Sequence, residues 1–186
     1  MEKWNAYKKE EEIRLVPPSM EYDADIMRLR QEFADANDPD SFAGCGSLSK
    51  CTTTQEWLQL LAEMESRETA EKKGLVPANT YLAIRNTDNR IVGVTDLRHH
   101  IDHPVLGLWG GHIGYSVRPS ERGRGYAKEI LRLILKKCRE RNMEKVMVTC
   151  NKKNPASESV ILSQGGVFEK EVLVDGEYIK RYWINI

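Results

Sequence analysis

The stretch HIGYSVRPSERGRGYAKEILRLILKKC, residues 112–138, decides the fold of this chain. Alternating apolar residues over 112–117 predict a β-strand, and apolar residues at helical spacing over 126–141 predict an amphipathic helix. A segment rich in glycine and arginine separates the two. Another apolar run, KVMVTC at 145–150, predicts a strand after the helix. A strand–helix–strand unit implies a right-handed crossover, and therefore two strands that lie parallel in one sheet.

The rest of the chain adds strands that are mostly joined by hairpins. The order β-α-α-β-β-β-α-β-α-β-β predicts an α/β (α+β) fold with a mixed, mostly antiparallel central sheet and a parallel strand pair in its middle. Thr54 is expected to open a helix without a capping box. Glycine and serine at 41–50 predict a loop, either a flap over a binding site or a plain connection. The other predicted elements are strands at 13–17, 80–86 and 91–99, a helix from 21, a short helix at 156–164, and a final hairpin around Asp175-Gly176.

The composition is that of one globular domain. With 186 residues, 40% of them hydrophobic and 30% charged, the chain is long enough for one core, and we expect a single domain over 1–186. Lys and Arg together number 28, as do Asp and Glu. No net charge therefore attracts nucleic acid or an anionic membrane, and neither partner is expected.

The sequence also carries expectations about location and metals. The N-terminal residues MEKWNAYKKEEEIRLV lack the apolar run of a secretory signal, and no stretch approaches the roughly 20 apolar residues that span a bilayer. Cys45, Cys51, Cys138 and Cys150 are scattered, with no C-x-x-C pair and no His at ligand spacing. We therefore expect reduced thiols in a cytoplasmic protein and no bound metal.

Arg122-Gly123-Arg124-Gly125 stands where the central helix is predicted to begin. Unpaired backbone N–H groups and the positive end of the helix dipole favour an anion at such a position. Glycine lets the backbone adopt positive φ and approach a phosphate closely, and arginine can fork onto phosphate oxygens. The alternative is a helix entry with a glycine turn and solvated arginines. The Lys-Ser/Thr ending of the nucleotide-hydrolase loop is missing, and Lys128 replaces the third glycine of the dinucleotide fingerprint.

The segment Arg122-Gly123-Arg124-Gly125-Tyr126-Ala127 resembles the Q/R-x-x-G-x-G/A signature of the GNAT acyltransferases, the Gcn-related N-acetyltransferase superfamily. The preceding IGYSVRPSER is similar to that family's fourth strand and turn, and the following helix, strand and NPAS helix opening resemble it in order and spacing. The stretch GGHIGYSVRPSERGRGYA is most similar to a group of bacterial proteins known mainly as predicted acetyltransferases. The resemblance implies a GNAT-like sheet with helices on both faces, and acetyl-CoA as co-substrate.

The resemblance also implies which residues bind acetyl-CoA. The backbone of Tyr115, Ser116 and Val117 would pair with the pantetheine amides, with an N–H near Val117 aimed at the thioester oxygen. Asn154 would meet the pantetheine arm, and Ser157 stands where the family commonly has Ala or Ser. The segment expected to wrap the pyrophosphate comprises Arg122, Gly123, Arg124, Gly125, Tyr126, Ala127 and Lys128.

Transfer to an amine also needs a base. A lysine-like amine has an unperturbed pKa of ~10.4, so a base or a water relay must remove a proton before it attacks. The titratable candidates on or beside the central strands are Asp96, His99, His100 and His112. We predict that His112 acts as the base and that Asp96 anchors the amine. The alternative for each histidine is a polar residue at the end of a strand.

The acid that protonates the leaving thiolate is a second open question. Many family members have a Tyr seven residues after the Asn, and here that position is Ile161. The proton would then come from Tyr178, from Tyr182 or from water. Of these, Tyr178 is the predicted catalytic residue. A covalent acetyl group on Cys150 is rejected because the sequence shows no partner that would activate this thiol.

The residues and the resemblance together predict an acetyl-CoA-dependent N-acetyltransferase that acts on a primary amine of an unidentified small molecule or peptide, by direct transfer in a ternary complex. The alternatives are a non-catalytic acyl-CoA-binding or sensing module and a nucleic-acid-binding domain, which the zero net charge disfavours. Asp35, Asp38 and Asp40 would favour a cationic acceptor if they face the cleft, and otherwise form a solvated helix end. The sequence leaves the oligomeric state open, with a homodimer as one alternative. It also leaves open whether acyl groups other than acetyl are transferred.

Overall fold

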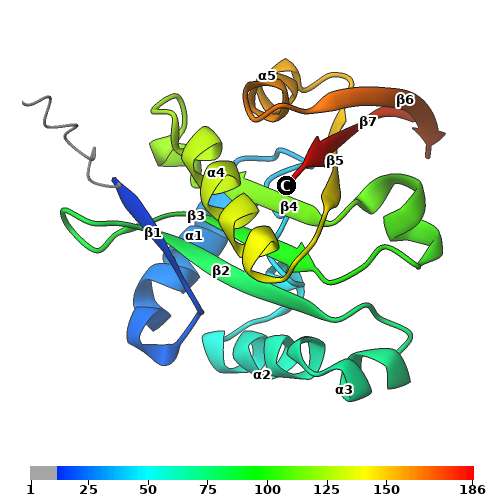
Figure 1. The fold of residues 1–186 in the computed structure, drawn as a ribbon. Helices are drawn as coiled ribbons and strands as arrows, with labels where there is room; N and C mark the ends of the chain where they lie inside the picture. The colour runs from blue at the N-terminus through cyan, green and yellow to red at the C-terminus, as the bar shows by residue number, and fades with distance from the viewer. Residues whose placement is uncertain (1–11) are drawn as a thin grey trace, which may run out of the picture.

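The central element of the molecule is a mixed β-sheet. The computed structural model describes residues 12–186. Residues 1–11, which belong to the stretch in which no secretory signal is predicted, lie outside this range. Within it the strands are β1 (Ile13–Val16), β2 (Ala78–Arg85), β3 (Ile91–Arg98), β4 (Ile113–Val117), β5 (Lys145–Asn151), β6 (Val167–Val174) and β7 (Glu177–Asn185). These seven described strands form one sheet in the order β1-β2-β3-β4-β5-β7-β6 (Figure 1). The strands β4 and β5 pair in parallel and the others antiparallel, which confirms the predicted sheet.

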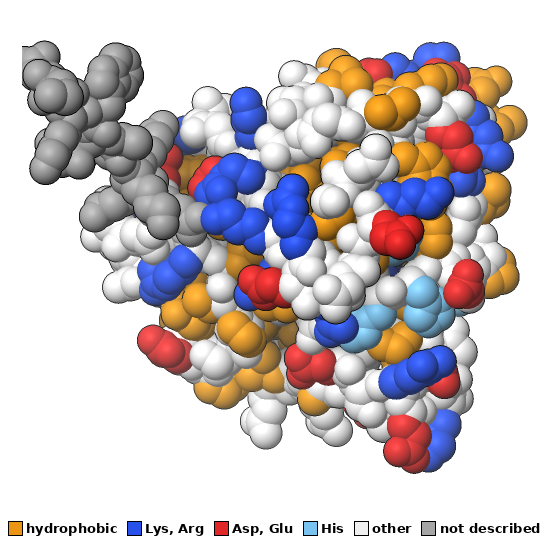
Figure 2. Space-filling view, in the orientation of Figure 1, with side chains coloured by type: hydrophobic (Ala, Val, Ile, Leu, Met, Phe, Trp, Pro, Cys, Tyr) orange, Lys and Arg blue, Asp and Glu red, His pale blue; other side chains and the backbone are white. Residues whose placement is uncertain are grey.

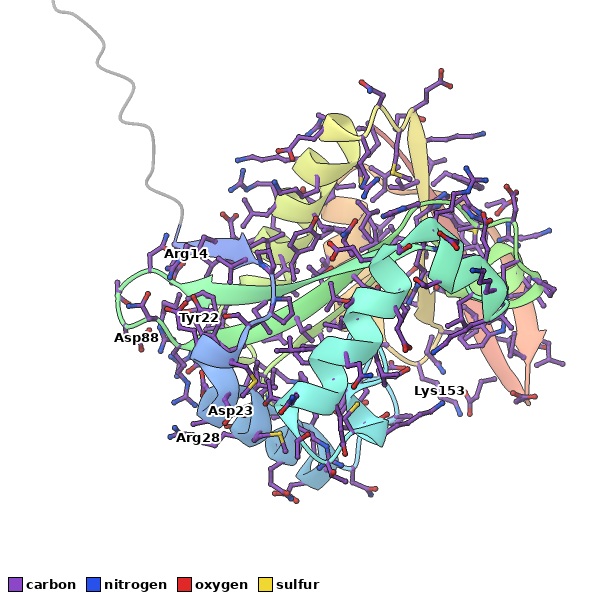
Figure 3. The ribbon with its side chains drawn as sticks, turned by 90° about the horizontal axis from the view of Figure 1, so that it is seen from below. Arg14, Tyr22, Asp23, Arg28, Asp88 and Lys153 are labelled. Atoms are coloured by element: carbon purple, nitrogen blue, oxygen red, sulfur yellow. The ribbon has the colours of Figure 1, made fainter. Side chains whose placement is uncertain are left out.

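Helices cover both faces of this sheet, as predicted. They are α1 (Asp23–Asp35), α2 (Thr54–Glu65), α3 (Arg67–Lys72), α4 (Tyr126–Glu140) and α5 (Pro155–Ser163). The side chains of α4 and α5 pack in a core on one face. The helices α1 and α2 cover the other face, and α2 lies toward the viewer in Figure 3. In the part of the chain that the structure describes, no helix is long and apolar enough to cross a membrane.

The position of α4 follows from its apolar face. Ile130, Leu131, Ile134, Leu135 and Cys138 recur at helical spacing and are buried. Polar positions on the opposite face carry Lys and Arg side chains, which lie over the helix in Figure 2. Packing of α4 against the sheet therefore fixes the place of the glycine–arginine segment, which leads directly into its first turn.

The start of α2 corrects one expectation from the sequence. Thr53, and not Thr54, is the N-cap: Thr53 Oγ1 accepts the Glu56 N–H at 3.2 Å, and the Glu56 carboxylate accepts the Thr53 N–H at 3.2 Å. This reciprocal pair is a capping box. The helix then buries Trp57, whose Nε1–H donates to a carbonyl of the loop 41–50 at 2.8 Å and so ties that loop to the core.

The parallel strands β4 and β5 separate soon after they meet. Their ladder contains one register pair, Ile113 with Val148. Just before it, the His112 N–H donates to the Met147 carbonyl at 2.8 Å, and the Met147 N–H donates to His112 Nδ1 at 2.9 Å. Past this point the facing backbone groups of 114–117 have no ladder partner on β5. The sheet is therefore open between the C-terminal halves of these two strands.

Candidate active site

The glycine–arginine segment forms a turn that leads into α4. Gly123 and Gly125 have φ angles of 77° and 85°, in the left-handed region that favours glycine. Gly125 is the N-cap of α4, so the segment lies at the helix end where backbone N–H groups lack intrahelical partners. A Cβ built on either glycine would meet no atom within 4 Å. The space in front of both glycines is thus open to a ligand.

A buried carboxylate holds this segment from behind. Glu121 is 5% exposed, and its Oε2 accepts a hydrogen bond from Arg85 Nη1 at 2.7 Å. Arg124 Nη1 lies 3.2 Å from the same oxygen, whereas Arg122 Nη1 lies 3.0 Å from the Asp38 carboxylate. The two arginines therefore differ in role: Arg124 extends toward Glu121, and Arg122 extends across the front of the segment.

A cavity of about 440 Å³, here called the large cavity, lies in front of this segment. Eleven of the twelve residues expected to bind acetyl-CoA line it, and Arg124 is the one that does not. Asp38 and Asp40 complete its polar wall. The expected residues that line it are Tyr115, Ser116, Val117, Arg122, Gly123, Gly125, Tyr126, Ala127, Lys128, Asn154 and Ser157. The structure thus brings together residues from β4, α4 and α5 that are up to 42 positions apart in the sequence.

A second cavity, of about 220 Å³ and here called the small cavity, lies where β4 and β5 diverge. Its walls include Gly114 of β4, residues 149–151 of β5 and residues 109–110 from the segment between β3 and β4. Four residues, here called the junction residues, line both cavities: Asp40, Tyr115, Asn154 and Ser157. Two molecules bound in the two cavities would therefore meet at the junction residues.

Hydrogen bonds connect the junction residues. Asn154 Nδ2 donates to Asp40 Oδ2 at 2.9 Å, and Asn154 Oδ1 accepts the Ser157 N–H at 3.0 Å as the N-cap of α5. The hydroxyl oxygens of Ser157 and Tyr115 lie 2.8 Å apart. Burial raises the pKa of Tyr115 to about 12, so its hydroxyl stays protonated at neutral pH. The network places a carboxylate and a protonated phenol around one point.

His112 and Tyr178, two of the predicted catalytic residues, line neither of these cavities. His112 is 7% exposed, and its Nδ1 accepts the Met147 N–H where β4 meets β5. Burial, assisted by the nearby positive charge of Arg98, lowers the pKa of His112 to about 4. Tyr178 is exposed on β7, with Lys152 Nζ 5.2 Å from its ring centroid. The contacts of His112 are those of a residue that joins two strands.

Asp96, the predicted amine anchor, also lies outside both cavity linings. It is 3% exposed, and its Oδ1 accepts the Gly114 N–H at 2.9 Å. Its Oδ2 lies 3.1 Å from Arg98 Nη2. Both carboxylate oxygens are therefore committed to groups that shape the small cavity, and Arg98 lines that cavity in its place.

Three further residues considered from the sequence have clear positions. Ile161, where the resemblance implies a tyrosine in many relatives, is fully buried in the core under α4. Tyr182 is buried and donates its hydroxyl to Glu158 at 2.5 Å. Cys150 lines the small cavity, and burial raises the pKa of its thiol to about 12. A thiol with this pKa is a poor nucleophile at neutral pH.

The loop 41–50 and the aspartate before it are the part of the site that the sequence left undecided. A Cβ on Gly44 would lie 2.3 Å from the Gly114 carbonyl oxygen, so loop and strand backbones are in direct contact. Ser116 Oγ donates to a loop carbonyl at 2.8 Å. These contacts bring Asp40 to the junction. The loop therefore forms a wall of the site. The sequence feature that could have indicated this is the presence of glycine at both 44 and 114, which permits the two backbones to approach closely.

Comparison with known families identifies the class of protein to which this fold belongs. Residues 13–167 match the family model of the acetyltransferase (GNAT) domain. The chain therefore belongs to the GNAT acetyltransferase family, which confirms the resemblance seen in the sequence. A comparison with curated proteins gives no match.

Solved structures of acetyltransferases share the fold. RimL, a ribosomal L7/L12 α-N-protein acetyltransferase in complex with coenzyme A, has a TM-score of 0.63 at 17% identity, covering 94% of each chain. The microcin C7 self-immunity acetyltransferase MccE, in complex with acetyl-CoA and AMP, has a TM-score of 0.65 at 18% identity, covering 94% of this chain and 93% of that one. The spermidine/spermine N-acetyltransferase SpeG of Vibrio cholerae has a TM-score of 0.63 at 13% identity, covering 94% of each.

Proposed function

We propose that this protein is an acetyl-CoA-dependent N-acetyltransferase that moves an acetyl group to a primary amine by direct transfer in a ternary complex. The observation that carries the proposal is the meeting of the large and small cavities at the junction residues, in the opening between β4 and β5. One cavity holds the donor and the other the acceptor, so that proximity converts a bimolecular step into a unimolecular one. The complexes of RimL and MccE with CoA or acetyl-CoA support this assignment of the donor.

Acetyl-CoA fits the large cavity. Its pyrophosphate would lie in front of Gly123 and Gly125, where the N-terminal end of α4 favours an anion and Arg122 and Lys128 add positive charge. The pantetheine arm would follow the edge of β4 at 115–117, whose backbone groups on this side have no partner strand. The thioester would then reach the junction residues.

Asp40 is the group we assign to the acceptor amine. Its carboxylate lines both cavities and keeps one hydrogen bond, from Asn154 Nδ2. A carboxylate at this point attracts an ammonium and can take its proton directly or through a water. The neutral amine then attacks the thioester carbon. This assignment differs from the prediction of His112 as base, whose Nδ1 is already bonded to the backbone of β5.

The step balances without a further reactant. The amine nitrogen forms the new C–N bond, the C–S bond breaks, and CoA leaves as a thiolate with a thiol-like pKa of ~8.5. The ammonium loses two protons: the first passes to Asp40 or water before the attack, and the second leaves the nitrogen after the C–N bond has formed. One proton is gained by the thiolate and the other goes to solvent, so a group that protonates the thiolate regains its own proton from the nitrogen. Tyr115 is placed to protonate the thiolate, because its protonated hydroxyl lies at the junction beside Ser157. Direct transfer also agrees with the unactivated thiol of Cys150.

His112, Asp96 and Tyr178 remain predicted catalytic residues that no geometry places beside the thioester. The hydrogen bonds of Asp96 to Gly114 and of His112 to the backbone of β5 favour positioning roles, because both support the opening between the strands. The cytoplasmic location is part of the same proposal. Its support is that all four cysteines are free thiols, the state that a reducing compartment maintains.

Turnover with a panel of primary amines tests the proposal. Purified protein is incubated with acetyl-CoA, and release of the CoA thiol is measured with peptides, spermidine and simple monoamines as acceptors. Asp40→Asn should lower kcat/KM for the amine by about 10²-fold, with acetyl-CoA binding unchanged. Asp35→Asn is the matched control, because Asp35 is an exposed carboxylate near Asp40 in the sequence that pairs with Gln31 and lines neither cavity.

The second candidate function is an acyl-CoA sensor without catalysis. The observation that favours the sensor is the burial of Ile161. This aliphatic side chain stands where, by the resemblance, many relatives have the tyrosine that protonates the leaving thiolate. A sensor would bind acetyl-CoA tightly and release no CoA thiol with any amine. Amine-dependent thiol release that is lost in Asp40→Asn would rule the sensor out.

A further inference from the structure

One wall of the small cavity is a turn that several side-chain hydrogen bonds hold in place. Residues Leu106–Gly110 form a single π-helical turn, a form that is rare and concentrated at functional sites. Its four last carbonyls each accept a hydrogen bond from a side chain of a neighbouring strand. These bonds run from Arg181 Nη1 to Gly107 at 3.0 Å and to Leu108 at 2.9 Å, from Thr149 Oγ1 to Trp109 at 2.7 Å, and from Arg98 Nη1 to Gly110 at 2.7 Å.

This anchoring determines where Trp109 lies. The residue lines the small cavity and is 37% exposed, so it lies where the cavity meets solvent. Ile113 and Ile179 add apolar surface to the same cavity. Because the backbone that carries this tryptophan is already held, little backbone freedom is lost when a ligand packs on the residue. The cavity therefore offers a preformed apolar and aromatic wall.

The charges of the small cavity admit one cation. Among the described residues that line it, Asp40 is the single carboxylate. The other charged lining residue is Arg98, which is positive and already paired with Asp96 at 3.1 Å. A first ammonium at Asp40 gains a favourable partner, whereas a second ammonium in the same cavity would find no further carboxylate among the lining residues. Polyamines are therefore poorly matched to this site.

We infer that the acceptor is a primary amine with a single positive charge, attached to an apolar or aromatic group that packs against Trp109. The inference rests on the proposed function and specifies its substrate class. The cavity volume of about 220 Å³ is many times the ~10–15 Å³ that a cavity needs to hold one water. That space suits a small arylalkylamine or one apolar residue bearing a free amine.

The test compares two acceptors in the wild-type protein and in three variants. The acceptors are 2-phenylethylamine, an aromatic monoamine, and spermidine, a polycation. The wild type should show a kcat/KM at least about 10-fold higher for 2-phenylethylamine. Trp109→Ala should raise the KM for 2-phenylethylamine about 10-fold or more, Trp109→Phe should restore most of it, and the Kd of acetyl-CoA should stay the same in both. Leu173→Ala is the control, because Leu173 is 61% exposed on β6 and lines neither cavity.

Each contrary outcome has a distinct meaning. A preference for spermidine, or an unchanged KM in Trp109→Ala, would overturn the acceptor class while the acetyltransferase assignment stands. Binding of acetyl-CoA without transfer to either amine would also overturn the acceptor class. A protein that releases no CoA thiol with any amine of the panel, whether or not it binds acetyl-CoA, would overturn the proposed function itself.

Discussion

Gly125→Ala separates the role of the glycine–arginine segment in binding from its role in folding. Gly125 has φ of 85°, and a Cβ added there would point into the open space where we place the pyrophosphate. Gly176, in the turn between β6 and β7, provides a matched control with φ of 83° and equally open space around an added Cβ. Alanine in the left-handed conformation costs roughly 1–2 kcal/mol at either position. For a chain of this size, each kcal/mol lowers Tm by about 2–4 °C.

The two variants should therefore lose similar stability and differ in CoA affinity. In Gly125→Ala the methyl group displaces the pyrophosphate from backbone N–H groups, and each lost hydrogen bond to a charged group costs about 1.5–3 kcal/mol. A loss of 1.4 kcal/mol is tenfold, so Kd for CoA should rise by about 10-fold or more, whereas Gly176→Ala should keep the wild-type Kd. Isothermal titration with CoA and thermal unfolding of both variants measure these quantities. Equal CoA affinities in two folded variants would refute the placement of the pyrophosphate.

Three more predictions address the junction and the strand contact. Cys150→Ala should keep most of the acetyl-transfer rate, because the raised pKa of this thiol leaves it unactivated; an acetyl group trapped on Cys150 and passed to the acceptor, seen by mass spectrometry, would show covalent transfer instead. Tyr115→Phe should lower kcat by about 10²-fold with little change in the Kd of acetyl-CoA, and a normal kcat in the folded variant would move the acid to Ser157 or water. Burial lowers the pKa of His112 from 6.5 to about 4, so the unfolded chain takes up this proton at higher pH than the folded one. The free energy of unfolding should consequently fall by about 3 kcal/mol from this residue alone as pH drops from 6.5 to about 4. His112→Gln, with an amide oxygen that can accept the Met147 N–H, should lose that part of the pH dependence in urea unfolding, and an unchanged pH profile would contradict the burial argument.

The sequence was most informative where regular periodicity and local backbone chemistry act together. The apolar stripe of α4 and the alternation before it located the parallel pair, and Asp175-Gly176 marked the final turn, which has φ of 48° and 83°. Gly123 and Gly125 were informative for the same reason, because a left-handed φ at a helix start is a local property. These features need few contacts from distant parts of the chain.

The remaining features of the site depend on long-range contacts that leave little trace in local sequence. Asp40 reaches the junction because Gly44 packs against Gly114 of a distant strand. Arg124 turns away from the large cavity because Glu121 is buried behind the segment. His112 looked like a free strand-end base, and only the register of β4 on β5 shows that its Nδ1 is bonded.

The central claim is that the large cavity binds acetyl-CoA with its thioester at the junction residues. A crystal structure of the protein with CoA bound tests it most directly. We predict pyrophosphate oxygens within hydrogen-bond distance of the backbone at 123–127, the pantetheine arm beside 115–117, and the sulfur next to Tyr115 and Asn154. CoA bound at another surface, or a pyrophosphate that makes no contact with the 123–127 backbone, would contradict the account.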